Sequence, residues 1–353
     1  MASGSRPNAG LQGGPPVEVS APVRVDLAGG TLDLWPLYCL HPGSMTVNAA
    51  LAAAVRVRLV PGGAPRGAIT LSSPGSAPRR LVPGDAGREL AAAVVFHLRP
   101  EGALAVEVTE QPPVGSGLGA SSAFAVALAR GCLALAGRRL APARLVPLLR
   151  DLESRVLAAP AGVQDYLPAL LGGVLAVHLE PGGERVERVA ADHTWLASRL
   201  LVVYSGLAHR SGMVNWEVYR ARIDGDAGVA RGLDRIAAAA ADCRRALLGR
   251  DEAAVGRAVA VDWRARRELA PSVTNPALDA LLAAGTAAGA LAGKACGAGG
   301  GGSVAFWVAP ERRGAVRAAA LAAAPGAFEV PGGLSGRGAT VRAGRATMAA
   351  ARG

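Results

Sequence analysis

The chain has 353 residues, of which 51% are hydrophobic and 4% aromatic, so it is long enough for two domains or one large one with a substantial core. The net charge of +11 raises the possibility of a nucleic-acid partner. Its basic residues are scattered arginines, with no dense block and no interleaved aromatic residues, and Lys294 is the only lysine. We therefore expect no nucleic-acid partner, and a basic surface favours a phosphorylated substrate or nucleotide.

Cysteine spacing and the N-terminal sequence bear on the cellular compartment. Residues 1–16 are rich in Gly, Pro, Ser and Asn and lack an apolar stretch, which predicts a disordered tail rather than a signal peptide. No segment has the length and purity of a membrane span. We expect a cytoplasmic protein with no membrane partner, in which four widely spaced cysteines are free thiols, Cys39, Cys132, Cys243 and Cys296.

Strands and helices alternate in the first half of the chain. A predicted strand at Val17–Val25 leads into a Gly29-Gly30 turn, and an apolar, alanine-rich helix is expected at Ser121–Ala136. The other expected elements are a strand-rich Ser44–Val60, a hairpin within Pro61–Pro83, a helix at Arg88–Leu98, a strand at Leu104–Thr109, an amphipathic helix at Ala143–Leu157 and a strand ending near His178.

A domain boundary is plausible within Asp192–Leu200. The elements expected beyond it are a strand at Leu200–Tyr204, helices around Val229–Leu248, Asp251–Leu269 and Pro276–Ala290, a strand at Ser303–Val308 and a helix at Ala315–Ala323. Mixed strands and helices in both halves predict two domains of α+β or α/β type.

The segment Gln111–Phe124, QPPVGSGLGASSAF, is the most informative motif. Gly115, Gly117 and Gly119 lie within five residues, and two serines and an apolar run follow. Glycines let backbone N–H groups approach a ligand, serines can cap the following helix, and a helix N-terminus attracts anions. The segment therefore has the outline of a phosphate-binding loop, although it matches neither the P-loop nor the dinucleotide-binding motif.

Four further features are ambiguous when each is taken alone. Ala21–Asp33 can be an ordinary strand and turn. Asp165, after a helix-ending turn, usually caps the next element but could accept a proton in a cleft. Glu153 can be a solvated helix charge or a ligand of Mg²⁺ near a triphosphate. The glycines of Lys294–Ser303 can form a linker, although their apolar flanks favour a close backbone approach.

Together and in this order, these segments resemble the motifs of the GHMP kinases, the family of galactokinase, homoserine kinase and mevalonate kinase. APVRVDLAGGTLD is similar to the first motif, PPVGSGLGASSA to the second and KACGAGGGGSVAFW to the third. The resemblance implies an α+β, two-domain fold. We expect a ribosomal-protein-S5-domain-2-like N-terminal domain at 17–195 and a ferredoxin-like C-terminal domain at 196–353.

One branch of the family looks most similar. The Gly-x-Gln-Asp-x-Tyr pattern of D-glycero-D-manno-heptose 7-phosphate kinases and fucokinase-type enzymes is approached by Gly162–Tyr166, and the segments at Tyr204–Gly206, Arg210–Gly212 and Thr274–Pro276 also resemble that branch. Those enzymes usually carry Gly-Gly-Gly-Thr-Asp where this chain has Gly-Gly-Thr-Leu-Asp, ending at Asp33. The sugar end of the site is therefore expected to differ.

The resemblance implies transfer of the ATP γ-phosphoryl to a hydroxyl of a sugar or sugar phosphate, with Mg²⁺ as cofactor and a homodimer as one possible assembly. Asp165 would be the base or orienting group, and Arg24 the cation that assists the nucleophile or the transferring phosphoryl. Ser121, or Ser122 in its place, and Glu153 would share Mg²⁺. The residues expected at the ATP phosphates are Pro113, Gly115, Ser116, Gly117, Leu118, Gly119, Ala120, Ser121 and Ser122, and those at the acceptor are Asp33, Gly30, Gly299, Gly300 and Arg210.

Other functions remain open from the sequence. A mevalonate-pathway kinase or a diphosphomevalonate decarboxylase would share the fold, although the Gln164-Asp165-Tyr166 pattern argues against both. A non-catalytic, ligand-sensing relative has no chemical need to keep Arg24, Ser121, Glu153 and Asp165 together.

Overall fold

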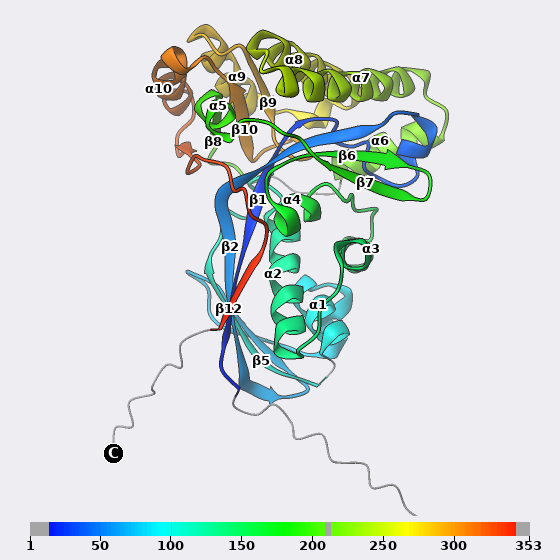
Figure 1. The fold of residues 1–353 in the computed structure, drawn as a ribbon, viewed down its shortest axis with the longest axis vertical. Coiled ribbons are helices and arrows are strands. Elements are labelled where there is room, and N and C mark those ends of the chain that lie inside the picture. The colour runs from blue at the N-terminus through cyan, green and yellow to red at the C-terminus, as the bar shows by residue number, and fades with distance from the viewer. Residues whose placement is uncertain (1–13, 100, 209–212, 344–353) are drawn as a thin grey trace, which may run out of the picture.

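The computed structural model describes residues 14–99, 101–208 and 213–343, so residues 1–13 of the predicted N-terminal tail lie outside the described part. The molecule is elongated, with a long sheet and its helices in one part and a second sheet under a layer of helices in the other (Figure 1). Strands and helices are mixed in both parts, as the α+β expectation requires.

The first sheet has eight strands among the described residues, with the order β12-β1-β2-β5-β3-β4 and the hairpin β6–β7 attached to β2. The pairing is antiparallel except between β3 and β5. Its strands are β1 Val17–Ala28, β2 Met45–Arg66, β3 Ile69–Ser72, β4 Arg79–Leu81, β5 Gly102–Glu110, β6 Val174–Glu180, β7 Gly183–Arg188 and β12 Thr340–Ala343.

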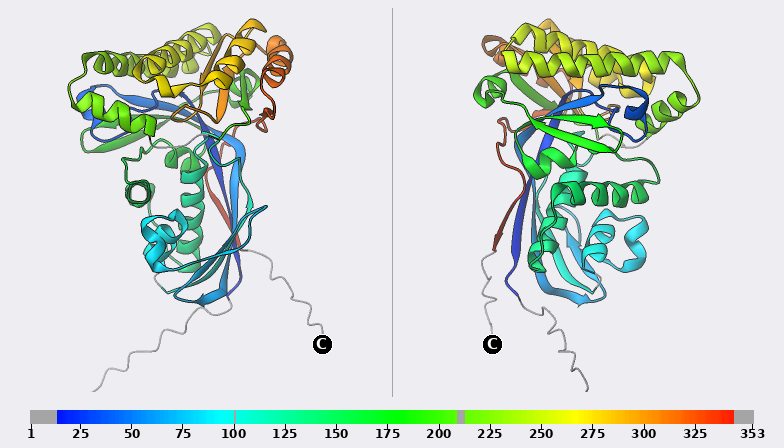
Figure 2. Two further views of the ribbon diagram at one scale, coloured as in Figure 1. Left: turned by 180° about the vertical axis from the view of Figure 1, so that it is seen from behind. Right: turned by 45° about the vertical axis from the view of Figure 1, so that its right-hand side comes forward.

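Helices cover one face of this sheet (Figure 2). The central one, α2 Ala120–Leu135, contacts β1 and β2, and most of its alanine-rich sequence is buried. Small side chains allow this close approach, and the helix starts directly after the glycine-rich loop. The other helices of this half are α1 Leu90–Leu98, α3 Pro142–Leu157 and α4 Tyr166–Leu171, with short 3₁₀ turns η1 Leu37–Leu40 and η2 Pro83–Gly87.

The second sheet is antiparallel, with the order β11-β8-β10-β9. In chain order β8 is followed by helices, β9, β10, a helix and β11, which is the ferredoxin-like arrangement. Its strands are β8 Leu200–Tyr204, β9 Ala292–Ala295, β10 Ser303–Trp307 and β11 Phe328–Glu329. The helices are α5 His193–Arg199, α6 Met213–Ile223, α7 Ala227–Gly249, α8 Glu252–Leu269, α9 Pro276–Ala287 and α10 Arg313–Ala323, with 3₁₀ turns η3 Pro271–Val273 and η4 Pro310–Arg312.

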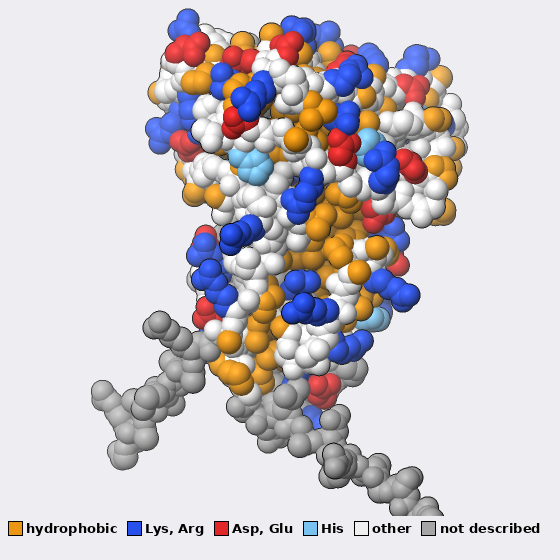
Figure 3. Space-filling view, in the orientation of Figure 1, with side chains coloured by type: hydrophobic (Ala, Val, Ile, Leu, Met, Phe, Trp, Pro, Cys, Tyr) orange, Lys and Arg blue, Asp and Glu red, His pale blue; other side chains and the backbone are white. Residues whose placement is uncertain are grey.

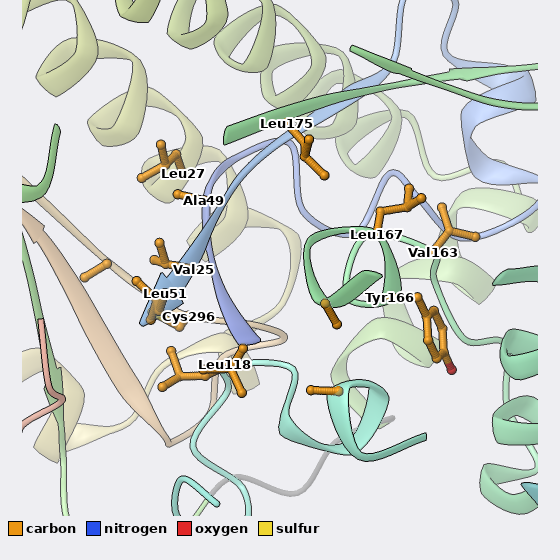
Figure 4. Packing of buried hydrophobic residues seen from close by; sticks show 14 of the residues in the cluster. Val25, Leu27, Ala49, Leu51, Leu118, Val163, Tyr166, Leu167, Leu175 and Cys296 are labelled. Atoms are coloured by element: carbon orange, nitrogen blue, oxygen red, sulfur yellow. The ribbon is translucent and has the colours of Figure 1, made fainter. Parts of the chain in front are cut away.

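One continuous cluster of buried hydrophobic side chains runs through both halves. Near the site it brings together β1, β2, the end of the glycine-rich loop at Leu118, the start of α4 at Tyr166, and Cys296 beyond β9 (Figure 4). The glycine-rich loop and the catalytic candidates are therefore attached to packed secondary structure.

The C-terminal strand departs from the expected division at 195/196. β12 pairs with β1, with Val17 opposite Ala343, so the end of the predicted C-terminal domain completes the N-terminal sheet. The chain crosses between the two parts through tight backbone contacts, in which the Gly173 N–H donates to the Ser335 carbonyl at 2.7 Å. The C-terminal segment of the chain therefore packs on the N-terminal domain.

Basic side chains are spread over both parts of the face shown in Figure 3, with acidic ones among them in the upper part. Within the described residues, no helix combines the length and apolar character needed to cross a membrane.

Candidate active site

A cavity of about 440 Å³ lies where the two parts of the molecule meet, a size typical of small-ligand sites. Its wall combines β1, the loop before α2, helix α3 and the start of α4 from the first part with α8 and the loop after β9 from the second. The predicted site residues that line it are Arg24, Asp33, Gly115, Ser116, Gly117, Gly119, Ala120, Ser121, Ser122, Glu153 and Asp165.

The N-terminus of α2 opens into this cavity. Gly119 precedes the helix in the left-handed conformation, with φ +70°, and no side chain caps the first turn. The expectation that the serines cap the helix was wrong, because both hydroxyls donate to Glu153 instead. The first N–H groups of the helix are thus left for a ligand, and the helix dipole favours an anion there.

The two glycine-rich loops touch through their backbones. A Cβ on Gly117 would lie 2.6 Å from the Cys296 carbonyl oxygen, and one on Gly302 would lie 2.7 Å from the Ser116 carbonyl oxygen. The Ser303 N–H also donates to Ser116 O at 2.9 Å. Glycine is therefore required at Gly117 both by its φ of +73° and by the space available.

Ser116 carries a further indication of a ligand. Its residue is 1% exposed, and its hydroxyl has no hydrogen-bond partner in the described structure. Two neighbours that we expected at the phosphates are placed differently: Leu118 is buried in the hydrophobic core, and Pro113 is not part of the cavity wall. Both support the loop through their carbonyl groups, Leu118 by accepting from Arg24 N and Pro113 by accepting from Ser116 N.

Glu153, on α3, faces the start of α2 and receives three hydroxyl donors. Ser121 donates to Oε1 at 2.7 Å, Ser122 donates to Oε2 at 3.1 Å, and the Tyr166 hydroxyl also donates to Oε2. Burial raises the pKa of Glu153, although these hydrogen bonds oppose the shift. The carboxylate is held in place by neutral groups, which leave its charge uncompensated.

Asp165 lies at the start of α4 beside the phosphate loop. A Cβ on Gly119 would be 3.2 Å from its carboxyl group. Arg24 Nε donates to Asp165 Oδ1 at 2.7 Å, and Nη1 of the same guanidinium donates to the Gly117 carbonyl oxygen at 2.6 Å. Arg24 is buried and therefore joins the predicted base to the predicted phosphate loop.

Asp33 lines the cavity and is 4% exposed. Burial raises its pKa from 3.8 to about 6, against the hydrogen bond that Gln164 N donates to Oδ2 at 3.0 Å. The absence of a side chain on Gly162 makes room for this carboxyl group, since a Cβ there would lie 1.8 Å from Oδ2. A buried carboxylate of this kind can accept hydrogen bonds from substrate hydroxyls.

Sequence reasoning missed a buried ionic cluster behind this wall. Lys294 Nζ lies 2.8 Å from Asp26 Oδ2 and 2.7 Å from Asp262 Oδ2. Arg266, which lines the cavity, lies 3.5 Å from Asp26 and donates to the Gly297 carbonyl oxygen at 2.6 Å. Burial opposes ionisation of Asp26, but Lys294 and the nearby arginines outweigh it and lower its pKa. The cluster fixes the third motif against β1 and α8.

Apolar side chains form another part of the cavity wall, and sequence reasoning missed them as well. It is lined by Leu90, Pro112, Val114, Phe124, Leu157 and Pro160. Val114 and Leu157 are exposed, and such side chains are suited to contact a planar, apolar ligand group. The sequence offered little signal for this surface, because of these residues only Pro112, Val114 and Phe124 lie close to the glycine-rich loop along the chain.

Three described residues that were expected at the acceptor, Gly30, Gly299 and Gly300, do not line the cavity. Gly30 packs behind it, beside Asp26 and Arg266. Gly299 and Gly300 face the other way: Gly300 N donates to the Val273 carbonyl oxygen at 2.8 Å, and a Cβ on Gly299 would collide with the same oxygen. The structure therefore does not bring these two glycines to the cavity, and their contact with an acceptor stays a prediction. Arg210 lies outside the described residues.

The donor set fits a hard divalent cation that arrives with phosphates. No group of three or more His, Cys, Asp or Glu side chains in the described ranges could hold a metal ion alone. Ser121 and Glu153 offer one hydroxyl and one carboxylate, and Mg²⁺ usually combines one or two carboxylates with phosphate oxygens and water.

Known proteins share both halves of this arrangement. The model of the GHMP kinases N-terminal domain matches residues 88–173, and that of the GHMP kinases C-terminal domain matches residues 240–326. The D-glycero-alpha-D-manno-heptose 7-phosphate kinase of Campylobacter jejuni is 23% identical over 312 residues, which cover 84% of this chain and 91% of that protein.

Solved structures of this family have the same fold. A D-glycero-D-manno-heptose 1-phosphate kinase from Bacteroides thetaiotaomicron matches with a TM-score of 0.70 and 21% identity, covering 92% of this chain and 98% of the other. Lactococcus lactis galactokinase, solved with galactose, matches with a TM-score of 0.76 and 16% identity, covering 92% and 95%. The chain therefore carries both GHMP kinase domains, the N-terminal one followed by the C-terminal one.

Proposed function

We propose that the protein is an ATP-dependent kinase that transfers the γ-phosphoryl group to a hydroxyl of a sugar or sugar phosphate. One observation carries the proposal. A single cavity holds an uncapped helix N-terminus, a hydroxyl–carboxylate pair suited to Mg²⁺, and the Asp165–Arg24 pair. These are the parts that phosphoryl transfer requires: a phosphate site, a cation site and a group that positions the nucleophile.

The nucleotide would lie along the α2 side of the cavity. The adenine base would contact the apolar side chains of the wall. The phosphates would accept hydrogen bonds from the first turn of α2 and from the Ser116 hydroxyl, which has no partner among the described residues. Ser121 and Glu153 would hold Mg²⁺, which neutralises phosphate charge when bound.

The acceptor would lie between Asp33 and Asp165. Asp165, oriented by Arg24, would receive or direct the proton of the attacking hydroxyl, and Asp33 would accept hydrogen bonds from other hydroxyls of a polyol. The named activities of the relatives, heptose phosphate kinase and galactokinase, are sugar phosphorylations and support this substrate class. We place the reaction in the cytoplasm, where ATP is available and the four free thiols stay reduced.

An ATP-consumption screen tests the proposal. Purified protein is incubated with MgATP and heptose 7-phosphate, fucose, galactose, glucuronate, mevalonate or homoserine, and ADP release and the phosphorylated product are measured. We expect turnover with a sugar or sugar phosphate that is lost in Asp165→Asn. Turnover with mevalonate would instead favour the isoprenoid-type alternative, and nucleotide binding without turnover of any acceptor would favour a ligand sensor.

A further inference from the structure

Among the carboxylates of the cavity, Glu153 is held in an unusual way. Asp165 has Arg24 as an ionic partner, whereas no ion pair is found for Glu153 within the described part of the chain, where three hydroxyl groups donate to it. A carboxylate bound by neutral donors keeps its charge available for an incoming cation. The three donors, however, are not equivalent.

Tyr166 is the rigid member of the three. Its residue is 0% exposed, and Figure 4 shows its ring beside Val163 and Leu167 with the hydroxyl turned away from the other labelled side chains. It shares Oε2 of Glu153 with Ser122, which is buried, whereas Oε1 is bonded to Ser121, which is exposed. The buried Tyr166 side chain therefore holds Oε2 of Glu153, and Oε1 lies at the N-terminus of α2.

Tyr166 also follows Asp165 directly, at the first turn of α4. Consecutive residues thus contact the two chemical centres of the cavity: Asp165 pairs with Arg24, and Tyr166 bonds to Glu153. A glutamate side chain has three rotatable bonds, so a fixed partner is needed to keep its carboxylate at a constant place relative to the base.

We propose, on the basis of the function proposed above, that Tyr166 is a positioning residue for the divalent cation. Its hydroxyl directs Oε1 of Glu153, together with the Ser121 hydroxyl, toward the ion that accompanies the nucleotide phosphates. Partners that orient metal ligands typically contribute 10–100-fold to metal affinity. A purely structural tyrosine would instead contribute only to folding.

Tyr166→Phe tests this because it removes the hydroxyl and keeps the ring. The matched control is Tyr204→Phe, which removes the hydroxyl of another buried tyrosine, on β8 outside the cavity wall. Binding of Mn²⁺ is measured by electron paramagnetic resonance with saturating AMP-PNP. AMP-PNP affinity at saturating Mn²⁺ and the thermal midpoint are measured on the same proteins.

We expect Tyr166→Phe to weaken Mn²⁺ binding 10–100-fold while AMP-PNP affinity at saturating Mn²⁺ stays within about threefold, and Tyr204→Phe to change neither. Mn²⁺ binding within twofold of wild type would overturn the role proposed for Tyr166 and leave the proposed function unaffected. Failure of the wild type to bind AMP-PNP would overturn the proposed function as well. If Tyr166→Phe does not fold, Ser122→Ala removes the other donor to Oε2 and is expected to weaken Mn²⁺ binding severalfold, and an unchanged value would count against the proposal.

Discussion

Asp33→Asn should make the protein more stable at neutral pH while impairing use of the acceptor. Burial raises the pKa of Asp33 from 3.8 to about 6, and each pKa unit corresponds to 1.36 kcal/mol. Ionised Asp33 therefore costs the ligand-free fold about 3 kcal/mol at pH 8. Asparagine has nearly the same shape, and its oxygen can still accept the hydrogen bond from Gln164 N.

The pH dependence has a definite sign. Because the folded-state pKa is above the unfolded one, the stability linked to protonated Asp33 is fully present below pH 3.8 and is lost as the pH rises through about 6. Urea unfolding without nucleotide should therefore give Asp33→Asn a higher midpoint than wild type at pH 8 and a nearly equal one at pH 4. In the kinase assay, kcat/KM for the acceptor should fall while KM for ATP holds.

Asp26→Asn is the matched control, because it removes another buried carboxylate of the same segment. Lys294 and nearby arginines lower the pKa of Asp26 against the effect of burial. Removing its charge leaves those cations undercompensated, and breaking such a buried pair typically costs 3–5 kcal/mol. At pH 8 we therefore expect the urea midpoint to rise in Asp33→Asn and to fall in Asp26→Asn. A lower urea midpoint for Asp33→Asn at pH 8, or the same gain at pH 4 and pH 8, would refute the reasoning.

Three further results are expected. Asp165→Asn should lower kcat at least ~10²-fold in the coupled ADP assay, and near-normal turnover would remove its assigned role. Gly117→Ala should abolish AMP-PNP binding, because the new Cβ would lie 2.6 Å from a backbone oxygen. The control Gly137→Ala has a similar φ of +62° but open space around it, and this variant should bind AMP-PNP normally. An equal loss of binding in both variants would mean that the positive φ, and not the close contact, causes the effect. Hydrogen bonds from Arg244 lower the pKa of Glu187 to about 2. Ionised Glu187 therefore stabilises the folded protein fully above pH 4.5, and this contribution is lost as the pH falls through about 2. Glu187→Gln should lower the thermal midpoint at pH 7 and less so at pH 3.

Much of the fold could be predicted because local signals were strong. Leu200–Tyr204 is an apolar run between polar residues, and the strand has those bounds. The helix expected at Val229–Leu248 spans Ala227–Gly249, where Asp226 caps its N-terminus. The strand Thr340–Ala343 was missed, because it exists only through pairing with residues more than 300 positions away. A polar, exposed segment of that kind has no periodic signal of its own.

The candidate site likewise combines residues that the local sequence predicts with residues whose role depends on tertiary packing. The glycine loop before α2 could be predicted because φ > 0 and close backbone contact restrict those positions to glycine. Arg266 could not, since it lies in a helix stretch, WRARRE, that is typical of a solvated face, yet tertiary packing buries it beside Asp26. The ionic role of Lys294 was equally invisible, because its partners are contributed by β1 and α8.

The buried carboxylates of the cavity region differ in how their charge is compensated, and this difference separates scaffold from site. Asp26 is compensated by several cations and has a lowered pKa, whereas burial raises the pKa of both Asp33 and Glu153. A fold selected only for stability would replace the latter two with neutral residues, because each costs free energy when ionised. Under the proposed function, the ligands would supply the compensation, as hydroxyl donors for Asp33 and a divalent cation for Glu153. On that proposal, the two uncompensated carboxylates would mark two different sites within one cavity, the acceptor site at Asp33 and the cation site at Glu153.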